Sequence, residues 1–150
     1  MYEKFGQFID GKWQPSEKND TYEVINPATE EVLGQASKAA PADVDKALKA
    51  AEKGLVVWKK TPPWQRSYIL RRIADMIRSK QDVLAKWMTL ETGKPLVEGK
   101  GEVGASADIF EWNAEETKRI YGQTVESRFE DTRVHVYYQP IGVVAALSPW

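Results

Sequence analysis

PIGVVAALSPW, residues 140–150, is the stretch that decides the fold expected for this sequence. Within it, VVAAL (143–147) is a continuous apolar run between glycine and a Ser-Pro pair. A short apolar run of this kind is typical of a strand buried on both faces of a parallel sheet. Such strands deliver functional residues just beyond their carboxyl ends, so we expect the site residues near Trp150.

Helical periodicity dominates the residues upstream of this strand. Pro41 suits a first helical turn, and apolar residues then recur at helical spacing as far as Leu55. A second helix is predicted to open at Pro62-Pro63, and a third to begin near Gln81. The third helix should stop at Gly93, because glycine followed closely by proline is a common carboxyl-terminal signal.

A fourth helix is predicted from Glu98 to Tyr121. Gly99, Gly101 and Gly104 weaken its first turns by up to ~1 kcal/mol each relative to alanine. Two interpretations follow from these glycines. Either the amino-terminal end of the helix is loosely formed, or other backbone packs closely against it.

Short β-structure is expected at both ends of the chain. Asp10-Gly11 predicts a type I′ hairpin within residues 7–14, because both central residues of that turn need positive φ. Residues 21–39 predict two short strands that are joined by a turn at Asn26-Pro27. Near the carboxyl end, RVHVYY (133–138) alternates like a strand. The sequence therefore predicts an α/β fold.

Composition restricts the class of protein. The chain has 150 residues, 42% of them hydrophobic and 29% charged, which is a globular balance. A formal net charge of -1 gives no basic surface for nucleic acid or for an anionic membrane. With no cysteine, these residues supply no disulfide, thiolate metal site or thiol nucleophile. The absence of a secretory signal and of a long apolar run favours a soluble, cytoplasmic protein.

No complete catalytic motif is present in these residues. The single histidine, His135, lies on an alternating strand without an acid or nucleophile nearby in sequence, and we interpret it as an ordinary strand residue. The carboxylate pairs Glu30-Glu31 and Glu115-Glu116 are better explained by solvation than by acid–base catalysis. GKGEVG (99–104) does not follow a strand, so it fails the test for a phosphate-binding loop. No catalytic residue and no metal ligand is therefore assigned from motifs.

Five segments, in order and at compatible spacing, resemble the amino-terminal part of aldehyde dehydrogenases. These segments are FIDGKW (8–13), INPATEEVLG (25–34), LETGKP (90–95), EWNAEETKRIYG (111–122) and QPIGVVAALSPW (139–150). The resemblance extends over essentially the whole chain. Within the family, the sequence is most similar to the succinate-semialdehyde dehydrogenase group.

The resemblance implies a division of the chain into three parts. Residues 1–122 would form the amino-terminal hairpin and the helical part of the cofactor-binding domain. Residues 123–139 would supply a strand of an oligomerisation sheet, and residues 140–150 the first strand of a doubly wound NAD(P)-binding core. The fold would then be α/β, aldehyde dehydrogenase-like and incomplete as given.

The resemblance also implies a reaction, a cofactor and a site. A cysteine thiolate beyond residue 150 would attack an aldehyde, such as succinate semialdehyde or a similar short semialdehyde, on the way to the carboxylic acid. The cofactor would be NAD or NADP, and it would lie against Leu147, Ser148, Pro149 and Trp150. The full-length protein would be a homo-oligomer, a dimer or a tetramer. The sequence leaves open the choice between NAD and NADP and the identity of the aldehyde.

Two further possibilities stay open. Some members of the family bind a structural cation, which here would involve the carbonyl groups of Val24 and Ile25 and the carboxylate of Glu91. Glu91 is equally well explained as an ordinary acid near a helix end. The alternative function is a non-catalytic oligomerisation or packing module that exists as a chain of 150 residues.

Overall fold

The computed structural model describes residues 6–148. Two small β-hairpins come first, four helices follow, and a third hairpin precedes an extended carboxyl-terminal segment. The strands are β1 (Gln7–Ile9), β2 (Lys12–Gln14), β3 (Thr21–Ile25), β4 (Val32–Ser37), β5 (Gln123–Glu126) and β6 (Arg133–Val136). The helices are α1 (Pro41–Trp58), α2 (Pro63–Ser79), α3 (Gln81–Thr92) and α4 (Leu96–Glu116).

The two amino-terminal hairpins form where turn residues predict them. Between β1 and β2, Asp10 and Gly11 have φ values of 53° and 76°, which confirms the type I′ turn. Between β3 and β4, the side-chain Oδ1 of Asn26 accepts a hydrogen bond of 2.9 Å from the backbone N–H of Ala28. This local bond stabilises the predicted turn, since it satisfies a backbone donor inside a tight loop.

The first three helices also begin near the predicted residues, and the third ends where its stop signal predicts. Proline occupies the first position of both α1 and α2, where the missing N–H costs no intrahelical hydrogen bond. Helix α3 ends at Gly93, which has a φ of 75°, and the N–H of Gly93 donates to the carbonyl of Thr89 over 2.9 Å. This left-handed cap confirms the expected stop signal.

Helix α4 differs from the prediction at both ends. It begins at Leu96, directly after Pro95, and ends at Glu116, before the expected end at Tyr121. Its glycine-bearing first turns are regular helix, and Gly99 is buried. A Cβ atom added at Gly99 would lie 3.1 Å from the carbonyl oxygen of Ala85 in α3. Of the two interpretations of these glycines, close packing of another backbone is therefore confirmed at Gly99.

The core lies between α2, α3 and α4 and consists of small side chains. The buried hydrophobic residues of these helices are Ala74, Ala85, Val103, Ala107 and Ala114. Alanine lets helices approach closely, although it buries little apolar area for each residue. At the margin of the α2–α4 interface, Arg78 forms ion pairs of 2.7 Å with Asp108 and 2.6 Å with Glu111.

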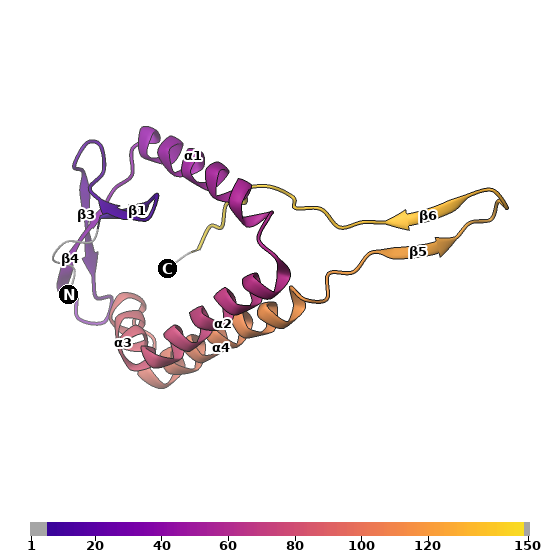
Figure 1. Cartoon of the computed structure of the whole chain (residues 1–150). Coiled ribbons are helices and arrows are strands. Elements are labelled where there is room, and N and C mark those ends of the chain that lie inside the picture. Colours follow the sequence, from indigo (N-terminus) through magenta and orange to yellow (C-terminus); the bar gives the residue numbers. More distant parts are fainter. Residues whose placement is uncertain (1–5, 149–150) are drawn as a thin grey trace.

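The third hairpin projects away from the helices (Figure 1). Strands β5 and β6 pair in antiparallel fashion, with Val125 opposite Val134 and Thr124 opposite His135. Every residue of the two strands is exposed. The sequence predicted only the second of these strands, because QTVE (123–126) is too short for a clear alternating pattern.

The carboxyl-terminal segment returns from this arm toward the space between α1 and the α2–α4 pair (Figure 1). The structure does not show the predicted strand at Val143–Leu147, since residues 137–148 have no regular secondary structure and Leu147 is 97% exposed. A parallel strand needs neighbouring strands, and the part of the chain that is described pairs its strands only as three separate hairpins. The division at residues 122 and 139 stays a prediction. Across residues 6–148, no helix combines the length and apolar character needed to span a membrane.

Candidate functional site

The segment predicted to bind a dinucleotide is extended and accessible. Leu147 and Ser148 are both exposed, and neither takes part in a backbone hydrogen bond within the described residues. Their carbonyl groups are therefore open to donors such as ribose hydroxyl groups. Pro149 and Trp150, the other two predicted cofactor residues, lie outside the described residues.

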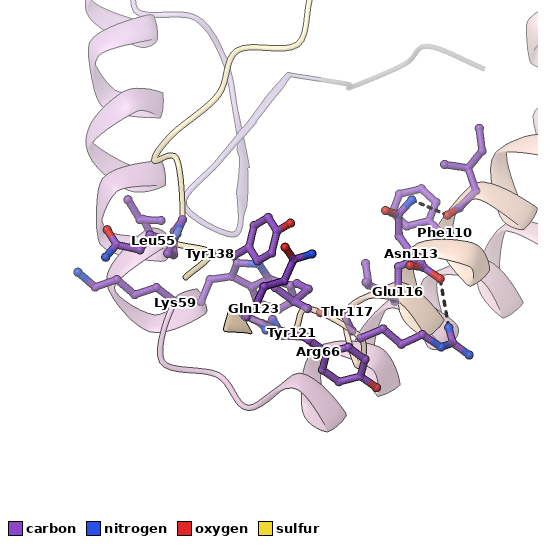
Figure 2. Close-up of a pocket in the computed structure, with 18 residues that line it drawn as sticks. Leu55, Lys59, Arg66, Phe110, Asn113, Glu116, Thr117, Tyr121, Gln123 and Tyr138 are labelled. Carbon is purple, nitrogen blue, oxygen red and sulfur yellow. Dashed lines mark hydrogen bonds and ion pairs between the residues drawn. The ribbon is translucent and has the colours of Figure 1, made fainter. Parts of the chain in front are cut away.

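A pocket of about 1210 Å³ lies at the root of the β5–β6 arm (Figure 2). It is formed where the carboxyl-terminal end of α1, the amino-terminal half of α2 and the carboxyl-terminal end of α4 meet the two ends of the hairpin. Its apolar lining comes from Leu55, Trp58, Leu70, Ile109, Phe110, Ile120 and Pro140, with the aromatic rings of Tyr121 and Tyr138. Sequence reasoning missed this pocket, because four separate elements contribute to it and none carries a motif.

The polar part of the pocket carries more positive than negative charge. Lys59, Arg66 and Arg119 line it together with a single acid, Glu116. Glu116 already pairs with Arg119, whose Nη1 lies 3.1 Å from the Glu116 Oε1. The Nε atom of Arg66 is buried, and no described residue accepts a hydrogen bond from it. The pocket therefore contains a guanidinium group, that of Arg66, with a buried N–H donor that makes no hydrogen bond.

A second polar cluster joins the amino-terminal hairpins to α1. Asp43 is 3% exposed, and its carboxylate accepts hydrogen bonds from the backbone N–H groups of Ala40 at 3.0 Å and Glu17 at 3.0 and 3.2 Å. These bonds, first that from Ala40 and then that from Glu17, lower the pKa of the Asp43 carboxyl group below its ordinary value. Lys46 lies 3.7 Å from Asp43 and 3.1 Å from Glu17. The cluster caps a helix and holds a loop, so its role is structural.

The acidic pair on α4 and the histidine on β6 both contact neighbouring side chains of the fold. On α4, Glu115 forms ion pairs with Arg71 and with Lys118, the latter at 2.8 Å. His135 Nδ1 lies 3.2 Å from the hydroxyl oxygen of Thr124 on the paired strand. These surroundings agree with the interpretation of His135 as an ordinary strand residue.

The region of the possible structural cation is brought together by the fold. A Cβ atom at Gly93 would lie 3.1 Å from Cγ of Pro27, so the end of α3 packs against the β3–β4 turn. Val24 pairs with Gly34 and Ile25 with Val32, so the β-bulge opposite these two residues lies in β4, close in sequence to that turn. Among residues 6–148, His, Asp and Glu side chains form no group of three that could hold a metal. A cation held mainly by carbonyl groups stays a prediction.

The sequence is similar to known enzymes along nearly its whole length. A sequence profile of the aldehyde dehydrogenase family matches residues 13–150. The glutarate-semialdehyde dehydrogenase of Pseudomonas aeruginosa is 43% identical over 143 residues, which are 95% of this chain and 30% of the relative. The succinate-semialdehyde dehydrogenase [NADP(+)] of Escherichia coli is 42% identical over 142 residues, again 95% of this chain and 30% of the relative.

The fold is shared as well. The crystal structure of succinate-semialdehyde dehydrogenase from Burkholderia pseudomallei superposes with a TM-score of 0.87 at 38% identity, covering 92% of this chain and 29% of that one. The chain thus spans about 30% of the length of the curated relatives that it matches. With a profile match over nearly the whole sequence and the same arrangement of hairpins and helices in a solved relative, the chain belongs to the aldehyde dehydrogenase family.

Proposed function

We propose that the chain is the amino-terminal portion of an NAD(P)-dependent dehydrogenase that oxidises a short semialdehyde, such as succinate or glutarate semialdehyde, to the acid. The observation that carries this proposal is the unbroken similarity over 143 residues to an enzyme that acts on glutarate semialdehyde. The similarity to succinate-semialdehyde dehydrogenases supports the same kind of substrate, a short chain that carries an aldehyde at one end and a carboxylate at the other.

The catalytic groups of this proposal lie outside the 150 residues. A cysteine thiolate would attack the aldehyde carbon, and hydrogen-bond donors would stabilise the oxyanion that forms. The chain contains no cysteine, so it supplies scaffold and not the nucleophile. The bound NAD or NADP would accept the hydride. We therefore expect the 150-residue chain alone to be inactive.

Leu147, Ser148, Pro149 and Trp150 are the residues that we propose to hold the cofactor. For Leu147 and Ser148, a role in cofactor binding is supported by their exposure and by their backbone carbonyl groups, which are open to hydroxyl donors. Proline at 149 lacks an N–H and fixes φ, which would keep the turn after Ser148 rigid. The sequence of these four residues does not distinguish NAD from NADP, because it offers no side chain that could discriminate the adenosine ribose.

The β5–β6 arm is proposed to pair with another subunit. Both strands are exposed over their whole length, and Val134 and Val136 are 41% and 37% exposed. A hairpin that projects with two unpaired edges and apolar side chains is a template for strand addition by another chain. This supports a homo-oligomer of the full-length protein.

The test is a steady-state assay of the full-length protein that carries these 150 residues. Succinate semialdehyde and glutarate semialdehyde would each be supplied with NAD+ or NADP+, and formation of the reduced nicotinamide would be followed by absorbance. The matched control substrate is the methyl ester of succinate semialdehyde, which has the same reacting group without the carboxylate charge. We expect the free semialdehydes to have the higher kcat/KM. Equal turnover of the ester would contradict the substrate class, and no turnover of any aldehyde would contradict the activity.

A further inference from the structure

The pocket at the root of the β5–β6 arm contains an arginine whose charge is not compensated. Arg66 lies in the first turns of α2, and its backbone N–H donates to the carbonyl of Pro62 over 3.0 Å. Its side chain is half-buried, and the Nε atom is buried without an acceptor among the described residues. Burying an N–H group of a guanidinium without an acceptor is costly, because the hydrogen bond that water would accept is lost.

The surroundings of Arg66 do not supply the missing acceptor. In Figure 2, Arg66, Thr117, Tyr121 and Gln123 line one region of the pocket. Glu116 is the one carboxylate among the lining residues, and it is paired with Arg119. Lys59, a second cation of the lining, forms no ion pair within residues 6–148. A planar guanidinium group in an apolar and aromatic setting is best matched by a carboxylate, which can accept two parallel hydrogen bonds.

The accessible surface indicates where that carboxylate comes from. The chain has an accessible surface of 11801 Å², whereas a compact folded monomer of the same mass exposes about 7,700 Å². The surplus of about 4,000 Å² on this one chain exceeds the one-sided share of most obligate interfaces, which bury roughly 2,000–5,000 Å² over both partners together. The chain also spans only about 30% of its relatives. The remainder of a protein of that length is large enough to cover this surface.

We propose that the pocket is filled by a segment of the same polypeptide beyond residue 150, and that this segment places an Asp or Glu carboxylate on Arg66. Arg66 is then a positioning residue, which fixes the helical part of the chain against the rest of the enzyme. The proposal rests on the proposed function only in that the chain is part of a longer aldehyde dehydrogenase, and it is independent of the substrate.

Zero-length coupling tests the proposal directly. A carbodiimide joins an amine to a carboxylate only when the two are in contact, and Arg66→Lys places such an amine in the pocket. The matched control is Arg72→Lys, because Arg72 is on the same helix but exposed, with its Nη1 3.3 Å from the hydroxyl of Tyr68. Both variants of the full-length protein would be coupled and mapped by mass spectrometry. We expect a link from position 66, and not from position 72, to an acidic residue beyond residue 150.

The remaining outcomes overturn the proposal. A link that joins labelled to unlabelled subunits in a mixed oligomer would make a second copy the occupant. An amine at position 66 that stays uncoupled, or that couples only to acetate added in solution, would leave no protein carboxylate in the pocket.

Arg66→Gln should also lower the melting temperature more than Arg72→Gln, and equal melting temperatures would contradict the ion pair. Aldehyde oxidation by the wild type, measured in parallel, separates failure of this proposal from failure of the proposed function.

Discussion

Gly99→Ala and Gly101→Ala should change the stability of the fold differently, although both glycines lie near the start of α4. Alanine is more favourable than glycine in a helix interior by about 1 kcal/mol, because the unfolded chain loses less backbone freedom when it folds. A Cβ atom at Gly101 would meet nothing within 4 Å. Gly101→Ala should therefore raise the free energy of unfolding by up to about 1 kcal/mol.

At Gly99 the same gain is opposed by a close contact. The added Cβ would lie 3.1 Å from the carbonyl oxygen of Ala85 and 3.4 Å from Oγ1 of Thr89. Ala85 is fully buried in the middle of α3, so its carbonyl can retreat only if the helix moves. Overpacking of this kind costs roughly 1–3 kcal/mol. After the gain in helix propensity, Gly99→Ala should range from nearly neutral to about 2 kcal/mol destabilising.

The comparison of the two variants isolates the contact, because the gain in helix propensity is common to both. Denaturant midpoints of the wild type and both variants of the full-length protein, measured under identical conditions, give the difference. We expect Gly99→Ala to be less stable than Gly101→Ala by about 1–3 kcal/mol. If Gly99→Ala stabilises the protein as much as Gly101→Ala does, α3 and α4 do not pack as closely as the structure shows, and the reasoning is refuted.

Three other predictions concern acid stability, assembly and the cofactor. Because hydrogen bonds lower the pKa of Asp43, its carboxylate stabilises the fold above the ordinary pKa, and this contribution is lost as the pH falls through the lowered pKa. Asp43→Asn should therefore flatten the acid side of a plot of melting temperature against pH, and an unchanged slope would contradict the cluster. Val136→Lys should weaken self-association in sedimentation without unfolding the protein, and an oligomer of unchanged size would count against strand pairing at β6. Trp150→Ala should raise the dissociation constant of NAD(P) about tenfold, equivalent to ~1.4 kcal/mol, in a calorimetric titration. Unchanged affinity together with a large fall in melting temperature would instead make Trp150 a packing residue.

Features that depend on a few neighbouring residues could be predicted from the sequence. The Asp10-Gly11 turn and the left-handed cap at Gly93 are both present, because each depends on the φ preference of the residues themselves. The prolines at 41 and 63 likewise begin α1 and α2. The end of α4 was less predictable, because the apolar residues near Tyr121 continue the helical spacing while they line the pocket.

The pocket and the Arg66 environment could not be predicted, because they depend on tertiary contacts. Arg66 lies in a helix in which two other arginines, Arg71 and Arg78, pair with carboxylates of α4. Nothing in the sequence distinguishes Arg66 from these. Only the three-dimensional arrangement shows that its Nε atom is buried and that the nearest elements offer no acceptor.

The disagreement at Val143–Leu147 has a different origin. An apolar run predicts burial, yet Val144 is 71% and Leu147 is 97% exposed. An amino-acid pattern reflects the environment in which the complete protein folds, and an exposed run of this length is unfavourable in water. The same holds for the other large apolar side chains that face solvent, such as Ile141 at 93%. Under the proposal that the chain is part of a longer aldehyde dehydrogenase, the remainder of that protein would lie beside these residues, and the pattern and the structure would agree. The same proposal accounts for the uncompensated Arg66, since packing partners elsewhere in that longer protein would cover both the exposed apolar run and the buried Nε atom.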